Sequence, residues 1–255
     1  MAVTISGPQI LLLSLPLLVL SEYNARSHAG TVIFKMLSSI SFLVGPLPRL
    51  TSQPTRYNLA ITSGLAFSLL GDYLLLPRKA TFSKRTTDGE KKISISFQAG
   101  ILAFAVAHIA YITAFLQTSG PEISYPTLGT TFVSTMILAK WLGVIYPPSI
   151  PQSSYTNNLL RLEIPKEMKP LVLGYAIIIS AMLAVAVATS TAEPGVWISQ
   201  QVLGATMFVI SDLFVAKDAF GRGVVASERG WMRIGVGYGL YFWGQMVIAG
   251  TVGAL

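Results

Sequence analysis

The stretches GLAFSLLGDYLLLP (residues 64–77) and VLGATMFVISDLFVA (residues 202–216) each place one aspartate inside a run of apolar residues. With their flanking residues, both runs are long enough for a membrane-spanning helix. An ionisable side chain at the centre of such a helix costs about 2.5–3.5 kcal/mol on insertion scales, so it marks a pathway, a proton relay or a reactive site. We therefore expect the function to involve Asp72 and Asp212.

The composition of the chain indicates a membrane protein. Of its 255 residues, 52% are hydrophobic and only 11% are charged, and its mean hydropathy is +0.61. Soluble domains carry about 25% charged residues. We expect an all-α fold, with one polytopic membrane bundle of about eight transmembrane helices forming a single domain over residues 1–255.

Residue types and net charge limit the cofactors and partners. The chain has no cysteine and only two histidines, His28 and His108, so it is poor in metal ligands. We expect neither a metal nor another cofactor. The formal net charge of +7 predicts basic loops at the anionic cytosolic leaflet rather than a nucleic-acid partner.

Apolar runs separated by proline, glycine or charge predict eight spans of roughly 20 residues. The first contains Pro16 and ends at Glu22, but no Lys or Arg precedes it and no small-residue cleavage site follows, so we interpret it as an uncleaved helix. The predicted spans are 5–21, 31–48, 57–76, 97–117, 126–146, 170–190, 197–216 and 231–254.

The basic residues lie mainly in every second loop. The loops on one side carry fourteen basic residues, whereas the opposite loops carry Arg49 and Arg56. This asymmetry predicts that the basic loops are cytosolic and that both termini are lumenal or extracellular, with the endoplasmic reticulum as the default membrane. The fourteen residues are Arg26, Arg78, Lys79, Lys84, Arg85, Lys91, Lys92, Arg161, Lys166, Lys169, Lys217, Arg222, Arg229 and Arg233.

The orientation predicts a common depth for three ionisable side chains. Lys35 lies about one turn after the cytosolic start of its span, and Asp72 and Asp212 lie about one turn before the cytosolic ends of theirs. At about 1.5 Å per residue, all three fall roughly 6–8 Å inside the cytosolic boundary. His108 and Gln245 are predicted to lie deeper.

Several of these residues also have a purely structural interpretation. A lysine one turn inside a helix end often extends to the interface, as we expect for Lys140. His108 is as compatible with a bond between helices as with catalysis. Gly71 and Gly204 are expected at close helix contacts. The aromatic residues Tyr73, Tyr111, Tyr238, Tyr241 and Trp243 fit an interfacial belt, a bundle core or the wall of a lipid site.

Several segments together resemble the YhhN family of membrane lysoplasmalogenases, and the likeness spans nearly the whole chain. It rests on a Gly-Asp pair, a His-x-x-Tyr motif and a Ser-Asp pair in three separate spans. Two departures are Met36 after Lys35, where the family often has proline, and longer loops at 78–96 and 147–169. The segments are FKMLSSISFLV (34–44), SLLGDYLLLPRK (68–79), FQAGILAFAVAHIAYITAF (97–115), GYAIIISAML (174–183), VLGATMFVISDLFVA (202–216) and YGLYFWGQMVIA (238–249).

The resemblance implies hydrolysis of the vinyl-ether bond of a lysoplasmalogen to a fatty aldehyde and a glycerophospho-ethanolamine or -choline. The partners implied are this lysophospholipid substrate and membrane lipids. Protonation of the outer alkene carbon gives an oxocarbenium ion, to which water adds. Two carboxyl groups suit this chemistry, because one donates a proton while the other, ionised, stabilises positive charge and accepts a proton from water.

One of Asp72 and Asp212 is therefore expected to be the general acid and the other the base, without an assignment of which. Lys35 is expected either to keep one aspartate ionised or to bind the lipid phosphate. The supporting residues, expected to orient water or the glycerol hydroxyl or to belong to the Ser-Asp motif, are His108, Tyr111, Ser211 and Gln245.

Other functions remain open at the level of the sequence. A small proton-coupled transporter also uses intramembrane acids, although no symmetric pair of broken helices is visible. A hydrolase of another single-chain lipid is a further alternative, but the multi-histidine site of a metal-dependent, ceramidase-type amidase is not available from one intramembrane histidine.

Overall fold

The structure is a computed structural model, and it describes residues 6–24, 27–76, 94–118, 123–147, 158–190, 199–221 and 230–252. Within these ranges the chain is helical, and the only β-type pairing is an isolated bridge between Leu162 and Gly221. The all-α fold predicted from the sequence is therefore confirmed. The basic loop residues at 78–92, together with Arg26, Arg222 and Arg229, lie outside the described ranges.

Eight long helices account for most of the described chain, joined by one short α-helix and one 3₁₀ turn. Serine or threonine caps several of them: Ser27, Thr55 and Ser199 each accept a hydrogen bond from a backbone N–H of the first turn, which satisfies a group the helix leaves free. The elements are α1 (Gly7–Tyr23), α2 (His28–Ser41), α3 (Pro46–Ser52), α4 (Arg56–Leu74), α6 (Ile95–Thr118), α7 (Tyr125–Leu142), η1 (Lys166–Met168), α8 (Lys169–Ala188), α9 (Gln200–Phe220) and α10 (Trp231–Gly250).

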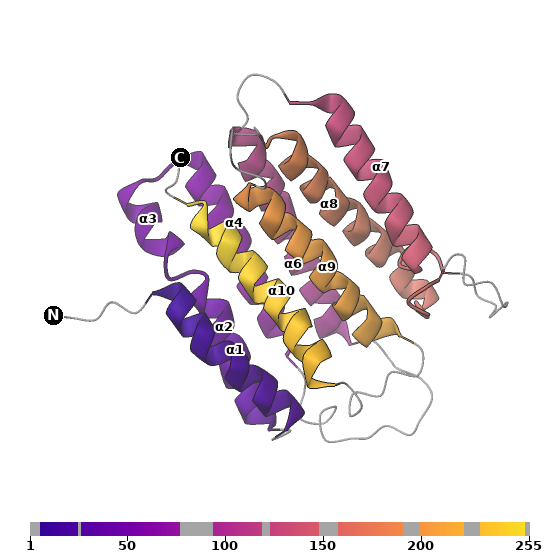
Figure 1. Ribbon diagram of the computed structural model, residues 1–255, viewed down its shortest axis with the longest axis horizontal. Coiled ribbons are helices and arrows are strands. Elements are labelled where there is room, and N and C mark those ends of the chain that lie inside the picture. The colour runs from indigo at the N-terminus through magenta and orange to yellow at the C-terminus, as the bar shows by residue number, and fades with distance from the viewer. Residues whose placement is uncertain are drawn as a thin grey trace.

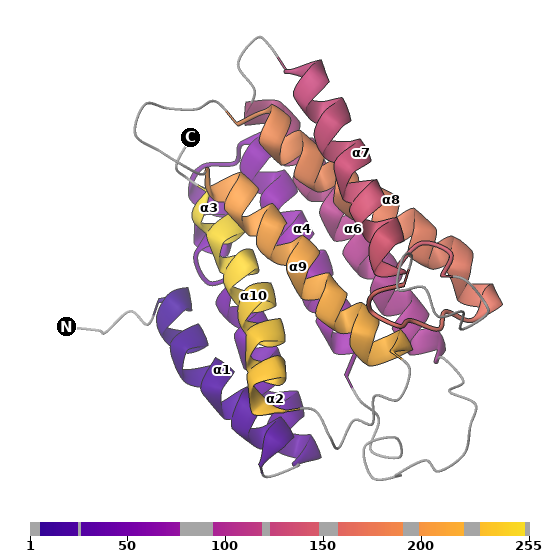
Figure 2. The same ribbon diagram turned by 45° about the vertical axis from the view of Figure 1, so that its right-hand side comes forward.

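The helices form one elongated bundle with α9 and α10 side by side near its centre (Figure 1). The pair α1–α2 covers one flank, and α7 lies at the opposite edge against α8 (Figures 1 and 2). Between them, α4 packs closely on α6. Residues from both halves of the chain therefore meet in the interior.

Three segments of the described chain are long and apolar enough to cross a membrane: His28–Ser52, Ile95–Gln117 and Lys166–Ala188. These three segments support the prediction that the chain is a membrane protein. That all eight long helices cross the bilayer stays a prediction.

Two predicted spans differ in detail from the helices, for identifiable reasons. The span predicted at 31–48 falls within the candidate membrane-crossing segment His28–Ser52, but a turn at 42–45 divides this segment into α2 and α3. Pro46 lacks the backbone N–H that would continue the helix. The span predicted to end at 216 continues to Phe220, because charge at Lys217 and Asp218 ends the apolar run without ending the helix. Asp212 thus lies more than one turn before the end of α9.

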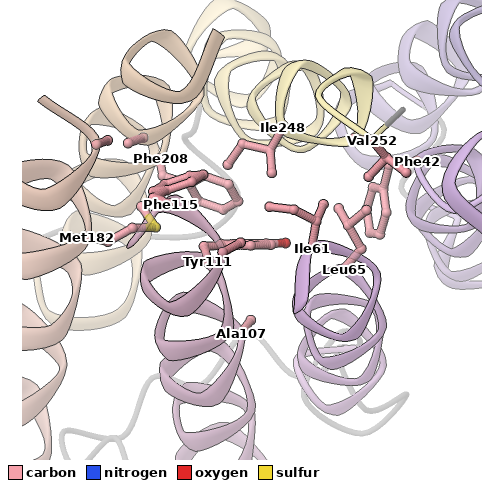
Figure 3. Close-up of a cluster of buried hydrophobic side chains, with 14 of the residues drawn as sticks. Phe42, Ile61, Leu65, Ala107, Tyr111, Phe115, Met182, Phe208, Ile248 and Val252 are labelled. Carbon is pink, nitrogen blue, oxygen red and sulfur yellow. The ribbon is translucent and has the colours of Figure 1, made fainter. Parts of the chain in front are cut away.

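Two apolar clusters form the core, and the larger of them also encloses polar side chains. Figure 3 shows Tyr111 of α6 among Ile61, Leu65 and Phe115, with its hydroxyl inside the bundle. Gly71 and Gly204, which we expected at close helix contacts, both lie close to a neighbouring helix. A Cβ on Gly71 would stand 2.7 Å from the Phe104 ring, and one on Gly204 would stand 3.2 Å from the backbone oxygen of Gly244.

Candidate active site

A partly open cavity of about 420 Å³ runs along α8, α9 and α10, a size typical of small-molecule sites. Its wall is mostly apolar, with contributions from α6 and α7 such as Phe97, Phe104 and Leu138. The charged residues that line it, within the described part of the chain, are Lys35, Asp72, Asp212, Asp218 and Arg233.

Asp72 has an ionic and two hydroxyl partners. Its side chain is buried, and Lys35 Nζ lies 3.5 Å from Oδ1. Ser39 Oγ donates to Oδ2 at 2.8 Å, and Tyr241 OH donates to the same oxygen at 2.7 Å. Lys35 and Ser39 are four residues apart, so α2 presents both on one face. These partners suit an ionised carboxylate, because a buried charge needs both a counter-ion and hydrogen-bond donors.

A buried polar chain continues behind Tyr241. Gln245 Nε2 donates to Tyr241 OH at 3.3 Å, and Tyr111 OH donates to Gln245 Oε1 at 2.7 Å. Ser68 Oγ lies 3.3 Å from Tyr111 OH. Because Tyr241 gives its only hydroxyl proton to Asp72, it must accept from the amide nitrogen of Gln245, and this bond holds the Tyr241 hydroxyl toward Asp72.

Asp212 has a different environment. Tyr175 OH donates to its Oδ2 at 2.6 Å, and His108 Nε2 lies 2.9 Å from the same hydroxyl. Among the described residues, no basic side chain forms an ion pair with Asp212. The two aspartates on this cavity therefore differ in their neighbours: one has a lysine, and the other has a tyrosine backed by a histidine.

The hydrogen bonds of Tyr175 set the tautomer of His108. When the single hydroxyl proton of Tyr175 goes to Asp212, His108 must donate from Nε2, which leaves Nδ1 as an acceptor. Nδ1 is buried and has no hydrogen-bond partner among the described residues. If Asp212 is protonated on its other oxygen, Oδ2 still accepts the hydrogen bond from Tyr175, so the bonds to Tyr175 and His108 keep their direction. The chain accommodates either protonation state of Asp212.

The residues singled out from the sequence fall into two groups. Lys35, Asp72, Ser211 and Asp212 line the cavity, although the Ser211 hydroxyl donates to the Phe208 carbonyl of its own helix at 2.9 Å. The other three are buried behind the cavity wall: His108 bonds to Tyr175, Gln245 bonds to Tyr241, and Tyr111 bonds to Gln245.

Three residues that contact the aspartates were not in the set predicted from the sequence: Ser39, Tyr175 and Tyr241. Helical spacing contains a signal for two of them, since Ser39 is four residues after Lys35 and Tyr241 is four before Gln245. Tyr175 belongs to a segment that resembles the family, but its apolar surroundings do not predict a contact with Asp212.

The described residues contain no group of three or more His, Asp or Glu side chains arranged to hold a metal ion. The fold and the cavity define a helical membrane protein whose site contains acidic and tyrosine side chains. The chain belongs to the YhhN family, whose profile matches residues 30–252 and so includes every residue of this site. No curated protein and no solved structure matches the chain.

Proposed function

We propose that the protein hydrolyses the vinyl-ether bond of a lysoplasmalogen, releasing a fatty aldehyde and a glycerophospho-alcohol. The observation that carries this proposal is the pair of carboxyl groups on one apolar cavity, each in a different electrostatic environment. Family membership supports it, since the motifs that resemble membrane lysoplasmalogenases fall on this cavity and its supporting residues.

The environments of the two aspartates suggest their roles. Asp72, beside Lys35, is the ionised carboxylate, and Asp212, without a basic neighbour in the described chain, is the proton donor. Two carboxyl groups with separated protonation behaviour are what acid–base chemistry at one site requires. Two-carboxylate glycosidases divide the work in the same way around an oxocarbenium-like transition state.

The reaction then proceeds in three steps. Asp212 gives its proton to the outer alkene carbon, so that the electrons of the double bond form the new C–H bond and the inner carbon becomes an oxocarbenium ion. Asp72 stabilises this cation and takes a proton from the water that adds to it. The hemiacetal formed loses its glycerol alcohol and yields the aldehyde, and proton transfer returns both carboxyl groups to their starting states.

The tyrosines hold the carboxyl groups in place during these steps. Tyr175, itself bonded to His108, continues to donate to Oδ2 of Asp212 as the charge of that carboxyl group changes, while Tyr241, held by Gln245, keeps one oxygen of Asp72 oriented. The apolar wall formed by residues such as Leu138, Ile179 and Val209 accommodates the single hydrocarbon chain of the substrate, because its burial is favourable in proportion to its apolar area.

Purified protein incubated with a 1-alkenyl lysophospholipid tests this proposal directly. We expect release of a long-chain aldehyde, measured by a coupled aldehyde dehydrogenase, and none with boiled protein. The saturated 1-alkyl ether should bind without being cleaved, because it has no alkene carbon to protonate. Absence of aldehyde from a folded, lipid-binding protein, or equal cleavage of the alkyl ether, would reject the vinyl-ether reaction.

A further inference from the structure

A second charged pair lines the cavity and takes no part in the proposed chemistry. Arg233, near the start of α10, forms an ion pair through Nη2 with Asp218 Oδ1, near the end of α9. Both side chains line the cavity, and their exposed fractions are 28% and 30%. A pair this exposed contributes little to stability, and its position on the wall calls for another explanation.

The pair lies at one end of the cavity, away from Asp212 and from Tyr241, which binds Asp72. Asp218 follows Asp212 by six residues on α9, which is about 9 Å along the helix, and Arg233 precedes Tyr241 by eight residues on α10, or about 12 Å. The chain leaves α9 and enters α10 at the same end of the bundle (Figure 2). The cavity therefore has two charged levels with an apolar wall between and around them.

We propose that Arg233 and Asp218 are the headgroup subsite of the cavity, with Arg233 binding the phosphate and Asp218 the ammonium of a zwitterionic lysophospholipid. This inference rests on the function proposed above. Arginine suits the phosphate because its guanidinium carries five donors in a planar fork, so that it binds an anion while keeping Asp218 on one nitrogen. The pair has one charge of each sign, as the headgroup does.

The spacing of the two levels fits the same ligand. Six bonds separate the phosphorus of a lysoplasmalogen from its inner vinyl carbon, and at the reach of an extended chain they span roughly 7 Å. A phosphate held by the long side chain of Arg233 thus places the alkene at the level of Asp212 and of the Asp72–Tyr241 hydrogen bond. The alkenyl chain continues along the apolar wall.

Asp218 gives the subsite a preference among headgroups. The ethanolamine ammonium donates hydrogen bonds to a carboxylate, and such charge-assisted bonds are stronger than neutral ones. An anionic headgroup without an ammonium, as in a lysophosphatidate, places its charge near Asp218 with no compensation. The subsite therefore selects a zwitterionic head over both an anionic head and a plain glycerol.

Binding of saturated ether lipids tests the subsite separately from turnover. The probes are 1-O-alkyl lysophosphoethanolamine, 1-O-alkyl lysophosphatidate and 1-O-alkylglycerol of one chain length, titrated calorimetrically into the purified full-length protein. Wild type should bind the lysophosphoethanolamine at least about tenfold more tightly than the alkylglycerol, as one charge-assisted bond allows. Arg233→Gln should reduce this preference to about threefold or less.

Lys217→Gln is the matched control, because Lys217 lies next to Asp218 on α9 and carries the same charge as Arg233 but does not line the cavity. It should keep the full preference. An unchanged preference in Arg233→Gln, or an equal loss in Lys217→Gln, would overturn the proposal.

Asp218→Asn provides a second test should Arg233→Gln fail to fold. It should shift the ratio of the two phospholipid affinities toward the lysophosphatidate by about tenfold, and an unshifted ratio would overturn the subsite. The two proposals fail separately: lysophospholipid binding that depends on Arg233 without aldehyde release rejects the reaction alone, whereas aldehyde release with an unchanged binding preference rejects the subsite alone.

Discussion

At the scale of the residue, Asp72 and Asp212 show how identical side chains acquire different roles. Lys35, Ser39 and Tyr241 converge on Asp72, so a negative charge there is both neutralised and hydrogen-bonded. Asp212 contacts the Tyr175 hydroxyl, whose other neighbour is His108. Each aspartate belongs to its own polar network, and the two networks face one cavity.

Asp72→Asn and Asp212→Asn should each reduce kcat by about 10²–10⁴-fold, the usual contribution of general acid–base catalysis. Asparagine keeps the volume of aspartate but neither delivers nor accepts the required proton. Kinetics on the alkenyl lysophospholipid measure the loss, and retained binding of the alkyl analogue shows that each variant is folded. Near-normal turnover in both variants would exclude the assigned roles.

Tyr241→Phe should lower kcat by about tenfold to a hundredfold, because it removes a hydrogen bond to a charged group, and should leave KM nearly unchanged. Tyr73→Phe is the matched control: Tyr73 is adjacent to Asp72 in sequence, but its side chain is 61% exposed and does not line the cavity. Equal effects of the two substitutions would show that Tyr241 does not position Asp72.

At the scale of the element, the apolar runs predict most of the helices but not the rotation of each helix about its axis. The runs locate α4, α6 and α8 to within a few residues, because burial of apolar surface and helix formation favour the same residues. They do not predict the contact of Tyr175 with Asp212, since hydroxyl-bearing residues occur on any face of a membrane helix. The break at Pro46 and the extension of α9 to Phe220 show where a run of hydropathy and a helix differ.

The contact of α9 with α10 depends on Gly204. Gly204→Ala should destabilise the protein by about 1–3 kcal/mol, as overpacked interiors do, because the added Cβ would stand 2.6 Å from Ile248 and 3.2 Å from a backbone oxygen. Gly174→Ala on α8 has no atom within 4 Å of the added Cβ and should be neutral or stabilising by up to about 1 kcal/mol. Thermal unfolding in detergent compares the two, and a Gly204→Ala variant as stable as Gly174→Ala would contradict this packing.

At the scale of the whole molecule, the bundle brings together residues that are far apart in the chain. Lys35 and Asp72 come from the first third, Tyr175 lies in the second half, and Tyr241 belongs to the last helix. The cavity therefore requires helices from both halves of the chain to pack together. The Arg233–Asp218 end of the cavity lies where α9 ends and α10 begins, on the side for which the distribution of basic residues predicts the cytosol.

The predicted topology is tested with tags in the intact membrane. A tag after Leu255 should be protected in sealed endoplasmic reticulum vesicles, because the excess of basic residues in the alternate loops places them in the cytosol. A tag inserted within residues 83–92 should be digested by added protease. The reverse pattern would place Asp72 and Asp212 near the lumenal leaflet and would contradict the depth predicted for them.

The most direct test of the central claim is to run the reaction in D₂O and locate the deuterium. The product aldehyde is reduced to the alcohol as it forms, which prevents later exchange, and is analysed by mass spectrometry. The carboxyl proton of Asp212 exchanges with the solvent. Protonation of the outer alkene carbon by Asp212 therefore predicts one deuterium on carbon 2 of the released chain. An aldehyde-derived alcohol without deuterium at that carbon would contradict the mechanism, because the bond would then have been cleaved without protonation of the alkene.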